Sequence, residues 1–264
     1  VGGAAGALVG AAAFAHLVPG VVAWRQMRCR LAPGLAGVGR RDHVALTFDD
    51  GPDRASTPAV LDALDEAGWK ATFFLLGEQV RRAPELAVEL VERGHELGVH
   101  GDRHVSHLRR PASWATSDVR RARDLIADVT GISAITSGDP GGGVDGNRAG
   151  SGSGAAGQGR ELRWFRPPYG ALAASSLVAA RRVGLRPVLW TTWGVDWRPD
   201  STPASVADRV LSTFYPGATV LLHDSDVTSA PGAWRATVGA LPRLAGVWAD
   251  QGLTVGPLRD HGLD

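Results

Sequence analysis

The sequence predicts an α/β fold, either a (β/α) barrel or an open doubly wound sheet. Short apolar segments alternate with longer segments of helical periodicity from about residue 43 to residue 258. The apolar segments are nearly continuous instead of alternating with polar residues, which is typical of parallel strands covered on both faces. Both observations favour a parallel sheet wrapped by helices.

The individual elements follow from the residues at the ends of each segment. Strands are predicted at 43–48, 70–77, 95–99, 161–165, 186–193, 218–223 and 253–258. Helices are predicted at 57–68, 83–94, 117–131, 171–184, 203–213 and 233–251. The first helix illustrates the reasoning, because Thr57 can cap it, Pro58 fits its first turn and Gly68 can end it.

Composition and charge are those of an ordinary globular protein. The chain has 264 residues, of which 44% are hydrophobic and 21% charged. Proteins that bind nucleic acid usually carry an excess of basic residues on one face. The net charge of this chain is only +1, so nucleic acid is not an expected partner. Cys29 is the single cysteine, so an intrachain disulfide is impossible.

The N-terminal segment resembles a membrane anchor. Residues 1–23 carry no formal charge, and Arg25, Arg28 and Arg30 follow them. Their length suits a membrane-spanning helix, although glycine and alanine make the segment only weakly hydrophobic. We expect residues 1–30 to be a hydrophobic helix with a basic flank that anchors the protein in a membrane, with a signal segment and a secreted form as the alternative. The arginines, taken alone, favour a domain that faces the cytoplasm.

A change in composition marks residues 137–160, which are rich in glycine, serine, aspartate and asparagine and show no periodicity. This composition predicts a disordered surface insertion. The segment contains neither a Walker-type Gly-Lys-Ser/Thr nor a GxGxxG between a strand and a helix, so it gives little support to nucleotide binding.

Two adjacent aspartates, Asp49 and Asp50, follow the first predicted strand, and Gly51 and Pro52 follow them. Adjacent carboxylates repel each other, and a nearby cation is the usual compensation. The C-terminal ends of strands form the catalytic face in barrels and open α/β sheets. A capping aspartate pair at a turn is the alternative for this motif by itself.

Three histidines follow the third predicted strand. His100 and His104 are four residues apart, so a helical turn would place both rings on one side. His107 offers a second pair with His104. Neutral imidazole is a common zinc ligand, whereas a hydrogen-bonded surface histidine is the alternative for each of the three.

Further polar residues follow other predicted strands. Arg166, in FRPPYG, can hold a carboxylate by a bidentate hydrogen bond. Asp196 lies between Trp193 and Trp197, and His223 ends an apolar strand, where a histidine can act as general acid or base. A barrel would gather all of these motifs at one mouth, and together they form the inventory of a metal-dependent hydrolase.

With these motifs, the chain resembles the polysaccharide deacetylases of carbohydrate esterase family four, which share the nodulation-factor deacetylase homology domain. TFDDGP, RPPYG and LLHD match the family closely, and VDW matches its Asp-Trp. The resemblance implies a distorted (β/α) barrel with fewer than eight strands, formed by residues 43–258 after a linker (31–42) and before a tail (259–264). It also implies a hydrolase that removes N-acetyl groups from an amino sugar.

The resemblance implies a metal site and a general base. Asp50, His100 and His104 would bind a divalent metal, most often zinc in the family, with cobalt or a similar ion as the alternative. Asp49 would be the general base, and Arg166 would orient it.

The resemblance also implies an acid, an oxyanion site and a substrate pocket. Asp196 would orient His223, the general acid, and the backbone N–H of Tyr169 would complete the oxyanion site. Trp197 and Leu222 would form the pocket for the acetyl methyl group. The expected substrate-binding residues are Trp197, Leu222 and Pro167.

One motif departs from the family pattern, which is His-Ser/Thr-x-x-His. Here it is His100-Gly101-Asp102-Arg103-His104, so the hydroxyl that braces the loop is absent. We hypothesise that Asp102 braces a ligand histidine instead.

The expected protein is a membrane-anchored, metal-dependent N-deacetylase whose catalytic domain lies on the outer face of the membrane. Its expected partner is an N-acetylated glycan of the cell envelope or a lipid-linked sugar. A non-catalytic glycan-binding module with a vestigial metal site is one alternative. The same chemistry on a non-sugar amide is another.

Overall fold

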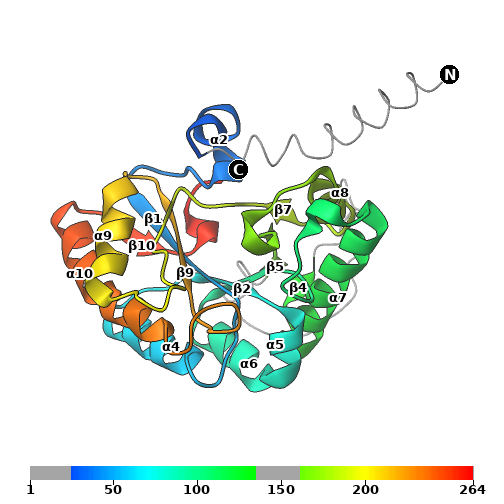
Figure 1. Ribbon diagram of the computed structural model, residues 1–264, viewed down its shortest axis with the longest axis horizontal. Helices are drawn as coiled ribbons and strands as arrows, with labels where there is room; N and C mark the ends of the chain where they lie inside the picture. Colours follow the sequence, from blue (N-terminus) through cyan, green and yellow to red (C-terminus); the bar gives the residue numbers. More distant parts are fainter. Residues whose placement is uncertain (1–24, 135–160, 264) are drawn as a thin grey trace, which may run out of the picture.

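A computed structural model describes residues 25–134 and 161–263, in which a curled parallel sheet is surrounded by helices (Figure 1). Within these residues, eight strands form one sheet, and a separate parallel pair joins β4 (Ser133–Ala134) to β5 (Glu161–Leu162). The strands of the main sheet are β1 (His43–Asp49), β2 (Thr72–Leu75), β3 (Glu96–Val99), β6 (Trp164–Phe165), β7 (Arg186–Pro187), β8 (Thr192–Trp193), β9 (Thr219–His223) and β10 (Thr254–Gly256). The predicted α/β fold is confirmed.

The resemblance implies fewer than eight strands, but the main sheet of the described residues has eight. Seven strands lie in one row, in the order β7-β6-β3-β2-β1-β9-β8. β10 is the eighth strand of the sheet, because it pairs with residues 43–45 of β1 while β2 pairs with residues 47–49 on the same edge. In the described residues, β7 and β8 do not pair with each other, so the barrel is distorted and its row of strands stays open.

The helices form the outer layer of the fold (Figure 1). They are α2 (Arg25–Leu31), α3 (Pro33–Ala36), α4 (Thr57–Glu66), α5 (Gly77–Arg82), α6 (Pro84–Glu92), α7 (Ala112–Thr130), α8 (Ala174–Arg182), α9 (Pro203–Thr213) and α10 (Trp234–Asp250), with short 3₁₀ turns at His107–Arg109, Pro168–Gly170 and Leu258–Asp260. α5 was not predicted, because Gly77 lies in the predicted strand 70–77 and no element was predicted for residues 78–82. The predicted strand 186–193 is divided into β7 and β8.

The core lies on both sides of β1, every residue of which is buried. Val44, Leu46 and Phe48 belong to the large cluster between the sheet and the helices, where the Phe48 and Phe73 rings stack 5.0 Å apart. Ala45, which belongs to a separate apolar cluster, alternates with these residues. The same alternation turns Asp49, at the end of the strand, toward the interior of the barrel.

The short helices α2 and α3 contact the chain between β7 and β8. The Arg28 guanidinium donates to the carbonyl of Trp190 at 2.6 Å, and the Leu189 N–H donates to the carbonyl of Leu35 at 2.8 Å. Backbone groups that strand pairing leaves open at this seam are thereby satisfied by the N-terminal helices.

The prediction of a membrane-anchored protein is corrected. Across residues 25–134 and 161–263, no helix combines the length and the apolar composition needed to cross a bilayer. The predicted anchor (1–23) and the predicted insertion (137–160) lie outside the described residues. The N-terminal hydrophobic helix is therefore not confirmed, and membrane anchoring has no part in the function proposed below.

Candidate active site

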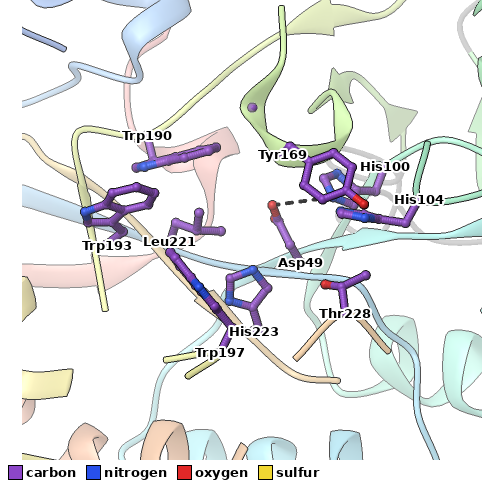
Figure 2. A pocket seen from close by; sticks show the side chains of 11 residues that line it. Asp49, His100, His104, Tyr169, Trp190, Trp193, Trp197, Leu221, His223 and Thr228 are labelled. Atoms are coloured by element: carbon purple, nitrogen blue, oxygen red, sulfur yellow. Dashed lines mark ion pairs between the residues drawn. The ribbon is translucent and has the colours of Figure 1, made fainter. Parts of the chain in front are cut away.

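Polar side chains meet at the C-terminal ends of the strands, around a pocket of about 260 Å³ (Figure 2). β1 and β9 end at Asp49 and His223, while His100 and Arg166 directly follow β3 and β6. The residues that line the pocket are Asp49, His100, His104, Tyr169, Gly170, Trp190, Trp193, Trp197, Leu221, His223 and Thr228.

Arg166 holds the Asp49 carboxylate in a fixed orientation. Its Nη1 donates to Asp49 Oδ1 at 2.7 Å and to Thr47 Oγ1 at 2.8 Å. Its Nη2 donates to the carbonyl of Leu189 at 3.0 Å, and the fully buried guanidinium lies 4.0 Å from the centroid of the Phe74 ring. Since Oδ1 of Asp49 is occupied by Arg166, Oδ2 is the oxygen that remains for a reacting group.

Asp50, His100 and His104 form a compact group with the donor atoms that a divalent metal prefers. Their nearest ligand atoms all lie within 4.8 Å of one another. Oδ1 of Asp50 lies 3.3 Å from His100 Nε2 and 3.4 Å from His104 Nε2. Nδ1 of His100 lies 2.8 Å from the carbonyl of Arg166, which orients the ring so that Nε2 faces Asp50.

The polar atoms of this group fit a cation. Oδ1 of Asp50 is buried and accepts no hydrogen bond within the protein, which is costly for a carboxylate oxygen unless a ligand satisfies it. Burial is the largest influence that lowers the pKa of His104, to about 4, so this ring is neutral at pH 7 and can bind a metal. An oxygen and two imidazole nitrogens suit zinc and similar ions.

Asp196 and His223 form a second pair, across the pocket from His100 and His104. Nδ1 of His223 lies 2.9 Å from Asp196 Oδ1, and Asp196 Oδ2 accepts hydrogen bonds from the His223 backbone N–H at 2.8 Å and the Thr237 hydroxyl at 2.7 Å. Burial lowers the pKa of the His223 ring, but the charge and hydrogen bond of Asp196, together with the charges of Asp50 and Asp49, outweigh burial and raise this pKa to about 10. His223 therefore carries a proton at neutral pH.

Strained backbone marks three loops of the site. Among the described residues, the non-glycine residues with positive φ are Asp50 (79°), Tyr169 (61°) and Val195 (54°). Each of them follows the end of a strand and adjoins or belongs to the predicted catalytic set. Such conformations cost energy and persist where the surrounding structure enforces them, which is common at functional sites.

Tyr169 is 65% exposed, and its ring lies edge-on to His104, with 4.1 Å between the ring centroids.

Two predicted substrate-binding residues are corrected. Trp197 lines the pocket as expected, but Leu222 is packed in the core between sheet and helices, and Leu221 lines the pocket instead. Strand alternation explains the difference, since Leu221 and His223 share one face of β9. Pro167 is buried, and its carbonyl accepts a hydrogen bond from the Gly170 N–H at 2.9 Å, so it shapes the turn rather than the pocket surface.

Several site residues were not predicted. The Thr228 hydroxyl donates to Asp50 Oδ2, and Trp190 lines the pocket. Thr47 could have been identified, because it lies two residues before Asp49 on the same face of β1. Thr228 and Thr237 belong to no recognisable motif, so no signal in the sequence indicates them.

Comparison with known proteins identifies the family. A family model for polysaccharide deacetylases matches residues 36–150. A chitooligosaccharide deacetylase of Sinorhizobium fredii is 30% identical over 220 residues, which cover 80% of this chain and 88% of that protein. The chain belongs to the polysaccharide deacetylase family. Its enzyme class is that of hydrolases acting on the N-acetyl groups of amino sugars.

Two further deacetylases match over smaller shares of their own length. A peptidoglycan-N-acetylglucosamine deacetylase of Bacillus cereus is 26% identical over 215 residues, covering 81% of this chain and 68% of that protein. The chain spans only 33% of the peptidoglycan-N-acetylglucosamine deacetylase PgdA of Listeria monocytogenes, to which it is 30% identical over 187 residues.

Solved structures share the fold. A family 4 carbohydrate esterase from Streptomyces lividans, in complex with acetate, has a TM-score of 0.63 and 26% identity, covering 81% of this chain and 92% of that chain. A family pseudoenzyme from Bacillus anthracis has a TM-score of 0.66 and 23% identity, covering 84% and 66%. At 23% identity, the likeness to the pseudoenzyme shows the fold alone.

In this polysaccharide deacetylase, charged groups hold the turn between His100 and His104. The Asp102 carboxylate accepts hydrogen bonds from Arg81 Nη2 at 2.8 Å and from Arg121 Nε at 3.2 Å. The hypothesis that Asp102 braces a ligand histidine is therefore corrected. Asp102 instead ties the turn to α5 and α7, the helices that carry these two arginines.

His107 lies apart from the candidate metal group. It is fully buried, with Nδ1 3.3 Å from the Ser176 hydroxyl and Nε2 3.8 Å from Asp118 Oδ2. In the part of the chain that the structure describes, the candidate metal group contains His104 but not His107. The possible ligand pair His104 and His107 is thus not brought together.

Proposed function

We propose that the protein is a metal-dependent deacetylase that hydrolyses the N-acetyl group of an N-acetylglucosamine-containing glycan. One observation carries this proposal. Asp49 and His223 face one pocket, Asp49 paired with Arg166 and His223 with Asp196, beside three residues that fit a cation. A base, an acid and a metal site at one mouth are the parts that amide hydrolysis requires.

Asp50, His100 and His104 would hold the metal. A divalent cation there would supply positive charge that lowers the pKa of water and polarises the amide carbonyl. The Thr228 hydroxyl donates a hydrogen bond to Asp50 Oδ2. Oδ1 of Asp50 therefore faces Nε2 of His100 and Nε2 of His104. Because Asp50 serves the metal, its neighbour Asp49 remains available as a base.

Asp49 would accept a proton from the attacking water through Oδ2. Arg166 fixes Oδ1 of Asp49, so the carboxylate cannot rotate away from the pocket. The backbone N–H of Tyr169 would donate to the oxygen on which negative charge develops. The positive φ of Tyr169 sets the direction of this loop at the rim of the pocket.

His223 would protonate the departing nitrogen. Asp196 holds the ring through Nδ1 and favours its charged form, which supports the role of an acid. In the overall reaction the C–N bond of the amide breaks and a C–O bond to the water oxygen forms. The products are acetate and the free amino sugar.

The substrate class is supported by the names of relatives. The similar proteins include deacetylases of peptidoglycan N-acetylglucosamine and of chitooligosaccharides. N-acetylglucosamine is common to both substrates, and we infer that this sugar, in an envelope glycan or a lipid-linked precursor, is the unit that the pocket accepts.

A non-catalytic glycan-binding protein with a vestigial metal site is the second candidate. The residues at the predicted catalytic positions favour the enzyme. Each of Asp49, Asp50, His100, His104 and His223 has a side chain capable of its role and a fitting partner in the structure.

The test is metal-dependent release of acetate. The 264-residue chain would be treated with a chelator and then supplied with zinc, cobalt or no metal, and acetate release from N-acetylglucosamine oligomers would be measured. We expect release only with metal, and its loss in Asp49→Asn while metal is still bound. Metal-independent release would contradict the proposed mechanism, and bound metal without release from any amide would favour the binding protein.

A further inference from the structure

An apolar recess extends the pocket below the level of the catalytic side chains. In the strand register, Asp49 of β1 pairs with His223 of β9, so the two lie at one level of the barrel. Trp193 of β8 pairs with Leu221, which lies two residues before His223. Two residues along a parallel strand correspond to about 6.6 Å. On the side of β8, the pocket therefore extends one layer of side chains deeper into the barrel than Asp49 and His223.

Tryptophan rings form the wall of this recess. Trp190 and Trp193 have ring centroids 5.7 Å apart, and Trp193 and Trp197 have centroids 5.2 Å apart, so the three rings make a continuous apolar surface. Figure 2 shows Trp190, Trp193 and Leu221 together on one side of Asp49, away from His104 and Tyr169. The recess is thus separated from the metal group.

The recess ends at Trp190. A Cβ atom on Gly170 would lie 2.5 Å from Cη2 of Trp190, so the glycine backbone closely approaches this edge of the ring. The fully buried Arg166 guanidinium lies 5.7 Å from the centroid of the same ring. These neighbours pack against Trp190 and limit the depth of the recess on this side.

We propose that this recess, formed by Trp190, Trp193 and Leu221, accepts the alkyl tail of N-acyl groups longer than acetyl. The proposal rests on the proposed function and extends its substrate class to N-acyl amino sugars with short acyl chains. The glycan would lie across the open mouth, and the acyl group would be the part that enters. The recess belongs to a pocket of about 260 Å³, and its tryptophan rings and Leu221 offer more apolar surface than one acetyl methyl can cover.

The chemistry of the step is unchanged by the length of the chain. Water adds its oxygen to the acyl carbon, the C–N bond breaks, and the nitrogen takes a proton. The products are the free amino sugar and the carboxylate of the longer acid. Burial of the added methylene groups against tryptophan would offset the loss of their mobility.

The first experiment compares acyl chains on one glycan. Fully deacetylated chitotetraose would be N-acylated with acetyl, propionyl or butyryl groups, and kcat/KM would be measured for the metal-loaded chain. We expect the butyryl substrate to be hydrolysed within about tenfold of the acetyl substrate, because each methylene that a pocket rejects costs about tenfold or more. Hydrolysis of the acetyl substrate with a greater loss for butyryl would overturn the inference but leave the proposed function intact. Release of neither acid would overturn both.

Substitutions at Leu221 provide the matched test. Leu221→Phe fills the recess, and we expect it to lower the ratio of butyrate to acetate release by about tenfold, whereas the volume-conserving Leu221→Met should keep this ratio within about twofold. The ratio does not depend on the fraction of folded protein, since both substrates are measured on the same preparation. An unchanged ratio in Leu221→Phe would place the acyl chain elsewhere and overturn the inference.

Discussion

The carboxylate of Asp118, on α7, accepts a hydrogen bond from the backbone N–H of Asp102, with 3.1 Å between Oδ2 and the nitrogen. The same oxygen would lie 2.9 Å from a Cβ atom on Gly101, whose φ is 102°. Asp118 thus occupies the space that a side chain at position 101 would need. Where the family pattern has a hydroxyl in the turn between the two histidines, this chain has glycine and a carboxylate from a neighbouring helix.

We therefore predict that Asp118 sets the affinity of the candidate metal site. Asp118→Ala removes the acceptor that holds the turn, so zinc affinity should fall by about 10- to 100-fold. Asp118→Asn keeps an acceptor oxygen and should restore most of the affinity. Competition with a chromophoric chelator measures both values, and Asp124→Ala, at a mostly exposed position of the same helix, is the control. Equal zinc affinity in Asp118→Ala and the unaltered protein would contradict this role.

Arg166 is predicted to stabilise the fold as well as the orientation of Asp49. Both side chains are buried, and removal of the guanidinium in Arg166→Ala leaves an unpaired buried carboxylate. The free energy of unfolding should fall by about 3–5 kcal/mol, measured by urea denaturation of the metal-free protein. The neighbouring exposed ion pair offers the control, since Arg163→Ala should change it by less than about 1 kcal/mol. Similar losses in both variants would show that the buried pair of Arg166 and Asp49 contributes no more to the free energy of unfolding than an exposed ion pair.

The sequence predicted the polar residues of the candidate site better than the apolar residues that line the pocket. Asp49, His100, Arg166 and His223 were identified because each ends or directly follows an apolar strand, and parallel strands bring such positions to one mouth. The pocket wall depends on which face of a strand a residue occupies. Leu222 was chosen on resemblance, whereas the period of two along β9 selects Leu221.

Contacts between distant segments could not be predicted. Thr228 reaches Asp50 from a loop 178 residues further along the chain, and no local pattern marks it. Backbone groups at the open seam of the barrel are satisfied by Arg28 and Leu35, which lie in the predicted basic flank and the predicted linker. Such contacts depend on the tertiary arrangement of short strands whose pairing partners a periodicity does not reveal.

The activity is predicted to fall at alkaline pH as His223 loses its proton. Burial lowers its pKa and Asp196 raises it to about 10, with further contributions from Asp50 and Asp49. A bound cation offsets the charge of these last two, so the alkaline limb of kcat in the metal-loaded enzyme should lie below pH 10. In Asp196→Asn, the largest raising influence is lost, and this limb should move to lower pH. A pH–rate profile of both proteins measures the shift, and an alkaline limb at the same pH in both would exclude His223 as the acid.

Stability is predicted to fall as the pH is lowered from about 6.5 toward 4. Burial lowers the pKa of His95 to about 4 and, together with the charge of His43, that of His261 to about 4. An unfolded histidine has a pKa near 6.5, so between these values the unfolded chain binds more protons and is favoured as the pH falls. Each of the two buried rings should cost about 2 kcal/mol at pH 5 relative to pH 7.5.

Urea denaturation of the metal-free protein at pH 7.5 and pH 5 measures this loss. His261→Gln removes one titrating ring, which lies with Nδ1 2.8 Å from Nδ1 of His43. The variant should lose about 2 kcal/mol less than the unaltered protein between the two pH values. Because the comparison is a difference between two pH values, a lower stability of the variant itself does not affect it. An equal loss in both proteins would mean that the buried pair accepts a proton in the folded state as readily as in the unfolded chain.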